Sequence, residues 1–259
     1  MSKQKNLTEI CKEVGIRKKT LTERDMKKYR NNNPRSDKVM NTMLDISNTL
    51  DGDVVVIGGF CVHPKLLGFR KMRKLSNDLD CITDEKGIKT LYENFKGRLF
   101  QTTNYGDVFM EYNTLPFSFD TEETHGWKIP HDFYLDSVEF NIKNTPLNTI
   151  SPEYLITLKS RRAMEKGRVF GKDKLDTANV ILAPYFNKDT ENKKLDYVNL
   201  EKTASLIRQH SFNNLEQAKN YIESLGQAKD HLKKSEREIF SENISNLQKQ
   251  INKEYRILK

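Results

Sequence analysis

Two aspartates separated by a single residue, Asp78 and Asp80, are the side chains of this sequence best suited to chemistry. Residues two apart on a β-strand project from the same face, so both carboxylates can point one way while Leu79 points into a core. Paired carboxylates hold hard cations, and two Mg²⁺ ions can together activate an attacking hydroxyl and neutralise a leaving pyrophosphate. The spacing therefore favours a site for two Mg²⁺ ions, with Mn²⁺ as an alternative, although a solvated strand end would show the same pattern.

A glycine pair, Gly58 and Gly59, precedes these aspartates and directly follows the β-branched run at residues 54–57. Such a run is typical of a strand that is buried on both faces. Because glycine has no Cβ, its backbone can approach a phosphate closely, and a helix start offers free N–H groups to a triphosphate. The pair is a candidate phosphate-binding turn, and the alternative is a tight strand-to-helix turn with no ligand.

The elements that would position these residues alternate between helical and extended patterns. In the first half, the patterns predict helices over 36–50, 60–69 and 85–95 and strands over 54–57, 78–83, 108–112 and 133–142. Beyond Pro146 the signals become helical, with Pro152 at a first helical position, an end at Pro184, and charged amphipathic helices from Tyr197. We therefore expect an α/β (α+β) mixed-sheet core over 36–145, preceded by a basic N-terminal arm over 1–35 and followed by a helical domain over 146–259.

The composition indicates an anionic partner and no membrane. Lys and Arg number 44 against 36 Asp and Glu, which gives a net charge of +8. A basic balance favours a nucleotide, RNA or DNA as partner, although solvated lysine-rich helices would give the same number. No apolar run approaches the roughly 18 residues that span a bilayer, and no signal peptide follows Met1, so we expect a cytoplasmic protein. The three cysteines lack metal-ligand spacing and are expected to be reduced.

The motifs also resemble a known family. Gly-Gly-Phe at 58–60, followed by Ser-Asn-Asp-Leu-Asp at 76–80, resembles the signature of the DNA polymerase beta-like nucleotidyltransferase superfamily. Within it, the run from Lys74 through Ser76 to Asp80 is similar to that of the AbiE-type toxins of bacterial toxin–antitoxin systems. The stretches 132–139 and 151–176 also agree, so the resemblance covers residues 54–183. It implies a nucleotidyltransferase core with a helical C-terminal lobe.

The resemblance implies a third carboxylate on the strand over 133–142. Asp132 and Asp136 would face the same side of an ideal strand, but about 13 Å separates them, so they cannot both bind the metal ions. Residue parity does not choose between the two. The resemblance favours Asp132, which together with Asp78 and Asp80 would make up the catalytic and metal-binding set.

Further residues are assigned to substrate by the same resemblance. Gly58, Gly59 and Ser76 would contact the triphosphate, although Gly59 stands where many relatives have a serine, so these contacts can be entirely through the backbone. On the helical segment, Lys159 and Lys172 would reach phosphates, and Asp176 would orient a lysine.

The implied activity is transfer of a nucleoside monophosphate from a nucleoside triphosphate such as ATP to an acceptor hydroxyl. The toxin branch implies an RNA acceptor such as a tRNA end, and an antitoxin protein as partner. Two other readings stay open. One is a non-catalytic module on the same fold that binds nucleic acid or a partner protein, and the other is a transferase acting on a small molecule such as an antibiotic.

Overall fold

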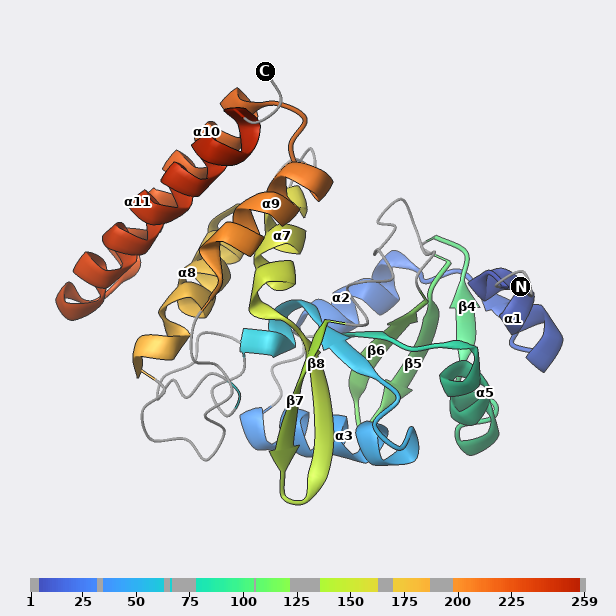
Figure 1. The fold of residues 1–259 in the computed structure, drawn as a ribbon. Helices are drawn as coiled ribbons and strands as arrows, with labels where there is room; N and C mark the ends of the chain where they lie inside the picture. The colour runs from blue at the N-terminus through green and yellow to red at the C-terminus, as the bar shows by residue number, and fades with distance from the viewer. Residues whose placement is uncertain are drawn as a thin grey trace. The chain divides into compact units, whose positions relative to one another are not determined.

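The computed structural model describes residues 5–31, 35–62, 66, 78–104, 106–121, 136–162, 170–186 and 198–256. The chain divides into two compact units, Met1–Cys61 with Met72–Ile150 and Val62–Lys71 with Ser151–Lys259 (Figure 1). The first unit is built on a β-sheet, and the described part of the second is almost entirely helical.

The described residues of the first unit form one eight-stranded sheet with the order β1-β4-β5-β6-β3-β2-β8-β7. Its strands are β1 (Lys18–Lys19), β2 (Val55–Ile57), β3 (Leu79–Ile82), β4 (Phe100–Thr102), β5 (Val108–Tyr112), β6 (Leu115–Asp120), β7 (Ser137–Ile142) and β8 (Thr145–Ile150). The β1–β4, β2–β8 and β3–β6 pairs are parallel and the other neighbours are antiparallel. This mixed sheet, together with the C-terminal helices, confirms the predicted fold class.

The helices of the first unit are α1 (Leu7–Val14), α2 (Glu23–Asn31), α3 (Ser36–Thr49) and α5 (Glu85–Asn94), with a 3-10 helix, η1, over Gly58–Val62. The side chain of Asn6 and that of Glu9 cap the start of α1 reciprocally, and Leu7 and Ile10 are buried. Helix α1 packs beside α5 (Figure 1), and Lys18 pairs with Gln101 of β4. Residues within the expected N-terminal arm thus contribute two helices, α1 and α2, and an edge strand to the first unit.

The core of the first unit comes from strands whose residues alternate between two environments. On β6, Leu115, Phe117 and Phe119 are buried, and the last two rings stack with centroids 5.8 Å apart. All three residues of β2 are buried, as the β-branched run at 54–57 predicts. Burying aromatic and branched side chains in this way stabilises the sheet that carries the candidate site.

The second unit contains α7 (Pro152–Arg162), α8 (Phe170–Phe186), α9 (Leu200–His210), α10 (Leu215–Gly226), the 3-10 helix η2 (Gln227–His231) and α11 (Lys234–Arg256). Helix α11 packs against α8, α9 and α10 (Figure 1), and Asn199 and Asn214 cap the starts of α9 and α10. The predicted end at Pro184 is wrong, because α8 continues for two residues beyond it. Among the described helices, none has the length and apolar character needed to cross a bilayer.

The described residues add detail to two predictions in the first unit. Within the predicted helix at 60–69, the residues up to Val62 belong to the 3-10 helix η1 and Leu66 is helical. In the strand predicted over 133–142, residues 133–135 lie outside the described structure and β7 begins at Ser137. That strand forms a hairpin with β8, which we did not predict. The turn between them places Lys143 and Asn144 at φ angles of 52° and 63°, and lysine at such an angle gives little turn signal in a sequence.

Candidate functional site

Asp80 lies on β3 in direct contact with the glycine turn. Its backbone pairs with Ile57, the last residue of β2, and Gly58 follows with a φ of 74°. A Cβ on Gly58 would stand 2.7 Å from Oδ2 of Asp80. Glycine is therefore required at position 58 both by the left-handed backbone and by the carboxylate beside it.

Asp78 directly precedes β3 and is exposed, whereas Asp80 is half-buried. Leu79 between them is only 1% exposed, as the alternation along a strand predicts. Burial, followed by the negative charge of Asp80, raises the pKa of the next residue, Cys81, well above its ordinary value. The two carboxylates thus stand at the start of a strand whose alternate side chains are anchored in the core.

Asp80 belongs to a row of residues that crosses four strands on one face of the sheet. Its partner on β6 is Ser118, the partner of Ser118 on β5 is Phe109, and the partner of Phe109 on β4 is Phe100. Paired residues of neighbouring strands project from the same face, so all four side chains share it. We call this surface the Asp80 face.

A buried carboxylate supports the Asp80 face beside Ser118. Asp107 accepts hydrogen bonds from the hydroxyl groups of Ser118 and Thr102, one on each of its oxygens. Because the proton of the Ser118 hydroxyl is directed to Asp107, the lone pairs of that hydroxyl remain available on its other side. Asp107 therefore fixes the orientation of the residue that faces Asp80.

Sequence reasoning missed a further carboxylate, Asp120. It ends β6, pairs with Ile82 of β3, and lies two positions beyond Ser118 on the same face. The alternation of Leu115, Phe117 and Phe119 with other residues, after the turn at Asn113, is the sequence signal that could have identified this strand. Asp120 is the acidic residue of β6 next to the Asp-x-Asp strand.

The other predicted residues of the first unit are placed as follows. Gly59 is half-buried in η1, and Asp136 directly precedes β7. Strand β7 is three places from β3 in the sheet, which corresponds to about 14 Å at the usual spacing between strands. Asp132 and Ser76 lie outside the described residues.

In the second unit, Lys159 and Asp176 meet in a buried ion pair. The Nζ of Lys159 on α7 lies 2.8 Å from Oδ2 of Asp176 and 3.2 Å from Oδ1 of Asp173, both on α8. The Lys159 side chain is only 4% exposed. Lys172, one residue before Asp173, is exposed and is not brought into this cluster. Lys159 thus has two carboxylate partners within its own unit.

The described residues supply only two of the carboxylates that the predicted metal site would use. No group of three or more His, Cys, Asp or Glu side chains suited to a metal ion occurs in the described part of the chain. Asp78 and Asp80 carry carboxylate oxygens, which are the ligands that Mg²⁺ prefers, and Oδ2 of Asp80 lies against Gly58. The chemistry of these two residues fits a magnesium site, whose remaining ligands would come from substrate, water or a further carboxylate.

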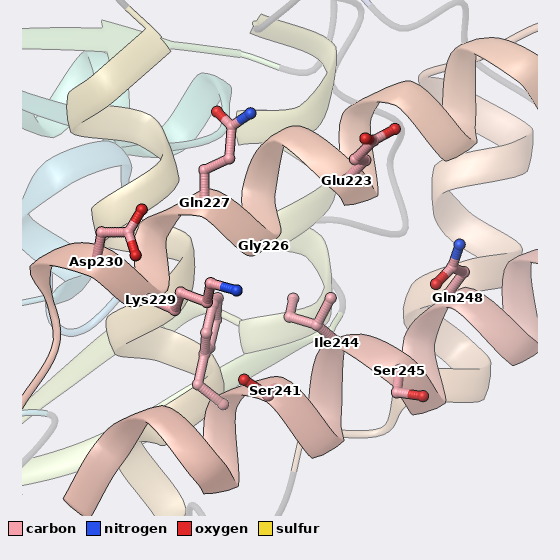
Figure 2. Close-up of a pocket in the computed structure, with 10 residues that line it drawn as sticks. Glu223, Gly226, Gln227, Lys229, Asp230, Ser241, Ile244, Ser245 and Gln248 are labelled. Carbon is pink, nitrogen blue, oxygen red and sulfur yellow. The ribbon is translucent and has the colours of Figure 1, made fainter. Parts of the chain in front are cut away.

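A separate hollow of about 410 Å³ occurs in the second unit, between α10, η2 and α11 (Figure 2). Its lining combines charged residues, Glu223, Lys229 and Asp230, with the apolar residues Phe240 and Ile244. None of the predicted site residues lines this hollow.

Comparison with known proteins finds no matching family model and no matching curated protein. The structure is similar to that of an antigenic nucleotidyltransferase-like protein from Paracoccidioides brasiliensis, with a TM-score of 0.44 and 17% identity, covering 56% of this chain and 76% of that chain. It is also similar to the solution structure of the antibiotic-resistance factor ANT(2'')-Ia, with a TM-score of 0.38 and 15% identity, covering 85% of this chain and 92% of that one. At these values the likenesses carry no conclusion about the activity of this chain.

Proposed function

We propose that this protein is a nucleotidyltransferase that moves a nucleoside monophosphate from a nucleoside triphosphate to a hydroxyl group of RNA. The observation that carries the proposal is the contact between the turn at Gly58 and the carboxylate of Asp80, 2.7 Å from a Cβ built on that glycine. A candidate phosphate-binding turn and a candidate metal ligand are thus neighbours, and a bound Mg²⁺ would supply charge neutralisation for a triphosphate there. The sequence order of glycine pair and Asp-x-Asp is the one that the resemblance implies.

Asp78 and Asp80 would hold the magnesium ions. Their ionised oxygens accept and do not donate, and the absence of a Cβ at Gly58 lets the Asp80 carboxylate lie against the glycine turn. When bound, Mg²⁺ neutralises charge on the triphosphate and lowers the pKa of a hydroxyl that it contacts.

The third carboxylate of the proposed site is Asp132 or Asp120. Asp132 is favoured by the resemblance. Asp120 is favoured by its position on β6, the strand that neighbours β3, and by its place on the Asp80 face. Asp136 is less suitable because three strand spacings, about 14 Å, separate its strand from β3.

We propose that Gly58, Gly59 and Ser76 contact the triphosphate of the substrate. Lys172 is exposed, whereas the ammonium of Lys159 is held by Asp176 at 2.8 Å. We therefore propose Lys172 as the phosphate contact of the second unit. Lys159 and Asp176 would position α7 and α8 around it.

In the proposed reaction the acceptor oxygen attacks the α-phosphorus in line with the leaving group. A bond forms between the acceptor oxygen and the α-phosphorus, the bond to the β,γ-pyrophosphate breaks, and the hydroxyl proton passes to the third carboxylate and then to solvent. Positioning and charge neutralisation supply most of the rate enhancement in reactions of this type. The resemblance to AbiE-type toxins extends the proposal to a toxin with an antitoxin protein as its partner.

A transfer assay tests the proposal. Each α-labelled nucleoside triphosphate is incubated with total RNA and Mg²⁺ and with either the native protein or the Asp78→Asn, Asp80→Asn double variant. Label entering RNA with the native protein alone supports the proposal and identifies the base. Label on a small hydroxylated compound and not on RNA would indicate the small-molecule transferase. Absence of label in every acceptor, together with RNA binding that EDTA leaves unchanged, would indicate a non-catalytic binding module.

A further inference from the structure

Positive charge is concentrated at the start of the chain. Residues 1–35 contain eleven Lys and Arg against four Asp and Glu, whereas the whole chain contains 44 against 36. This segment therefore accounts for most of the net charge of +8. In the structure its described residues are α1, β1 and α2 of the first unit.

Helix α2 lies on the Asp80 face of the sheet. The ring of Tyr29 packs on that of Phe109 with centroids 5.3 Å apart, and Phe109 belongs to the row that contains Asp80. Lys28 and Tyr29 also contact Glu111, two residues beyond Phe109 and so on the same face, at 2.7 Å and 3.1 Å. The basic helix and the proposed catalytic carboxylate thus share one side of the sheet.

Two neighbouring lysines of β1 project to opposite sides. The Nζ of Lys19 lies 4.8 Å from the ring centre of Phe100, which belongs to the row that contains Asp80. Lys18 pairs with Gln101, whose side chain donates a hydrogen bond to Thr8 of α1 on the other side. Lys19 is therefore on the Asp80 face and Lys18 is on the opposite one.

Three cations of this segment form no ion pair with a described carboxylate, although the charge of Lys19, after the hydrogen bonds from Thr22, is among the causes that lower the pKa of Asp25. Arg24 and Lys27 are exposed, lie one helical turn apart, and face away from the side of α2 that carries Tyr29. No described carboxylate forms an ion pair with Lys19, Arg24 or Lys27, whereas the neighbouring Lys28 is paired with Glu111. Unpaired surface cations of this kind are suited to phosphate groups, which release their own counter-ions on binding.

We infer that Lys19, Arg24 and Lys27 form a surface that binds the phosphates of single-stranded RNA on the Asp80 face. The inference rests on the proposed transfer to RNA and assigns the N-terminal segment the task of holding the acceptor. Strand β1 is four places from β3, or about 19 Å, so a short stretch of RNA can reach from Lys19 toward Asp80. An anionic membrane fits less well, because Tyr185 of the second unit is the only exposed large apolar residue in the described structure, and interfacial binding uses apolar anchors.

The test compares two triple variants by the fluorescence anisotropy of a labelled single-stranded RNA of about twenty nucleotides. One variant is Lys19→Gln, Arg24→Gln, Lys27→Gln. The matched control is Lys12→Gln, Lys18→Gln, Lys96→Gln, which removes the same charge from exposed residues of α1, β1 and the turn that follows α5. The binding is measured in EDTA and without nucleotide. We expect the first variant to bind the RNA at least about tenfold more weakly, and the slope of log affinity against log salt concentration to be shallower by about 2. The control should bind nearly as the native protein does.

Equal losses in both variants would overturn the inference, because net charge and not a particular surface would then explain binding. Native RNA affinity in both variants would overturn it as well. So would a first variant that binds RNA normally but no longer binds phosphatidylserine vesicles. The Asp78→Asn, Asp80→Asn variant separates this inference from the proposed activity. One outcome is a native protein that binds RNA through the three cations and yet transfers no label to RNA. That result would support the RNA-binding surface and refute the transferase activity.

Discussion

The carboxylate of Asp80 lies so close to Gly58 that a single carbon added at position 58 would collide with it. A Cβ at position 58 would lie 2.7 Å from Oδ2 of Asp80, and the φ of 74° at this position disfavours any other residue. The two motifs are therefore coupled through space, although 21 residues separate them in the sequence.

Gly58→Ala is expected to displace the Asp80 carboxylate. The left-handed backbone alone costs alanine about 1–2 kcal/mol, and a displaced ligand lowers metal affinity by about 10–100-fold. The measurement is Mn²⁺ binding by electron paramagnetic resonance, with thermal unfolding in parallel. Gly171→Ala on α8 is the control, because its added Cβ has no heavy atom within 4 Å. Native Mn²⁺ affinity in a folded Gly58→Ala protein would remove Asp80 from the metal site.

Lys159→Ala is expected to destabilise the second unit strongly. It leaves Asp173 and Asp176 facing each other on α8 without the buried ammonium between α7 and α8, which costs about 3–5 kcal/mol. Urea unfolding followed by circular dichroism measures the loss. Lys172→Ala, at an exposed position, should change stability by no more than about 0.5 kcal/mol. If Lys159→Ala keeps native stability but loses transfer activity, Lys159 is a substrate contact and not a structural one.

Asp107→Ala should destabilise the first unit by about 2–4 kcal/mol, because the hydroxyl groups of Thr102 and Ser118 lose their shared charged acceptor. Asp107→Asn retains one acceptor oxygen and should cost less. Chemical denaturation of the three proteins gives this ranking directly. An Asp107→Ala protein as stable as the native one would show that water replaces the carboxylate without cost.

Stability should decline in alkaline solution. Burial raises the pKa of Cys11 from 9.0 to about 11, and it raises that of Tyr29 from 10.0 to about 12. Between the unfolded and folded pKa values the unfolded chain has lost its proton and the folded protein keeps it, so stability falls as the pH rises from about 9. Denaturation midpoints measured from about pH 8 to 11 should show this fall, with a shallower slope for Cys11→Ala. Identical slopes would mean that the Cys11 thiol titrates alike in both states.

The sequence predicts those elements whose pattern is local. The buried run at 54–57, the alternation around Leu79 and the strand at 108–112 all correspond to observed strands, because β-branched or alternating residues leave a signal within a few positions. The mixed sheet with C-terminal helices is confirmed for the same reason.

Elements that depend on partners far along the chain were missed. Strand β1 has only two residues, both lysines, and exists because β4 offers it a free edge. Asp120 and Asp107 are unremarkable in the sequence, and only strand order brings them to the face of Asp80. The resemblance implies that Asp176 orients a lysine, but no sequence pattern indicates that Asp173 joins Lys159 and Asp176 or that the cluster is buried.

The parallel pairing of β2 with β8 has a consequence for how the protein is made. Val55 and Asn148 are partners, so nearly a hundred residues must leave the ribosome after β2 before its second neighbour arrives. Until then β2, a short strand of three buried apolar residues, has an uncovered edge of the kind that promotes aggregation. Nascent chains that end before residue 145 should therefore depend on chaperones, and release from them should coincide with the emergence of the β7–β8 hairpin.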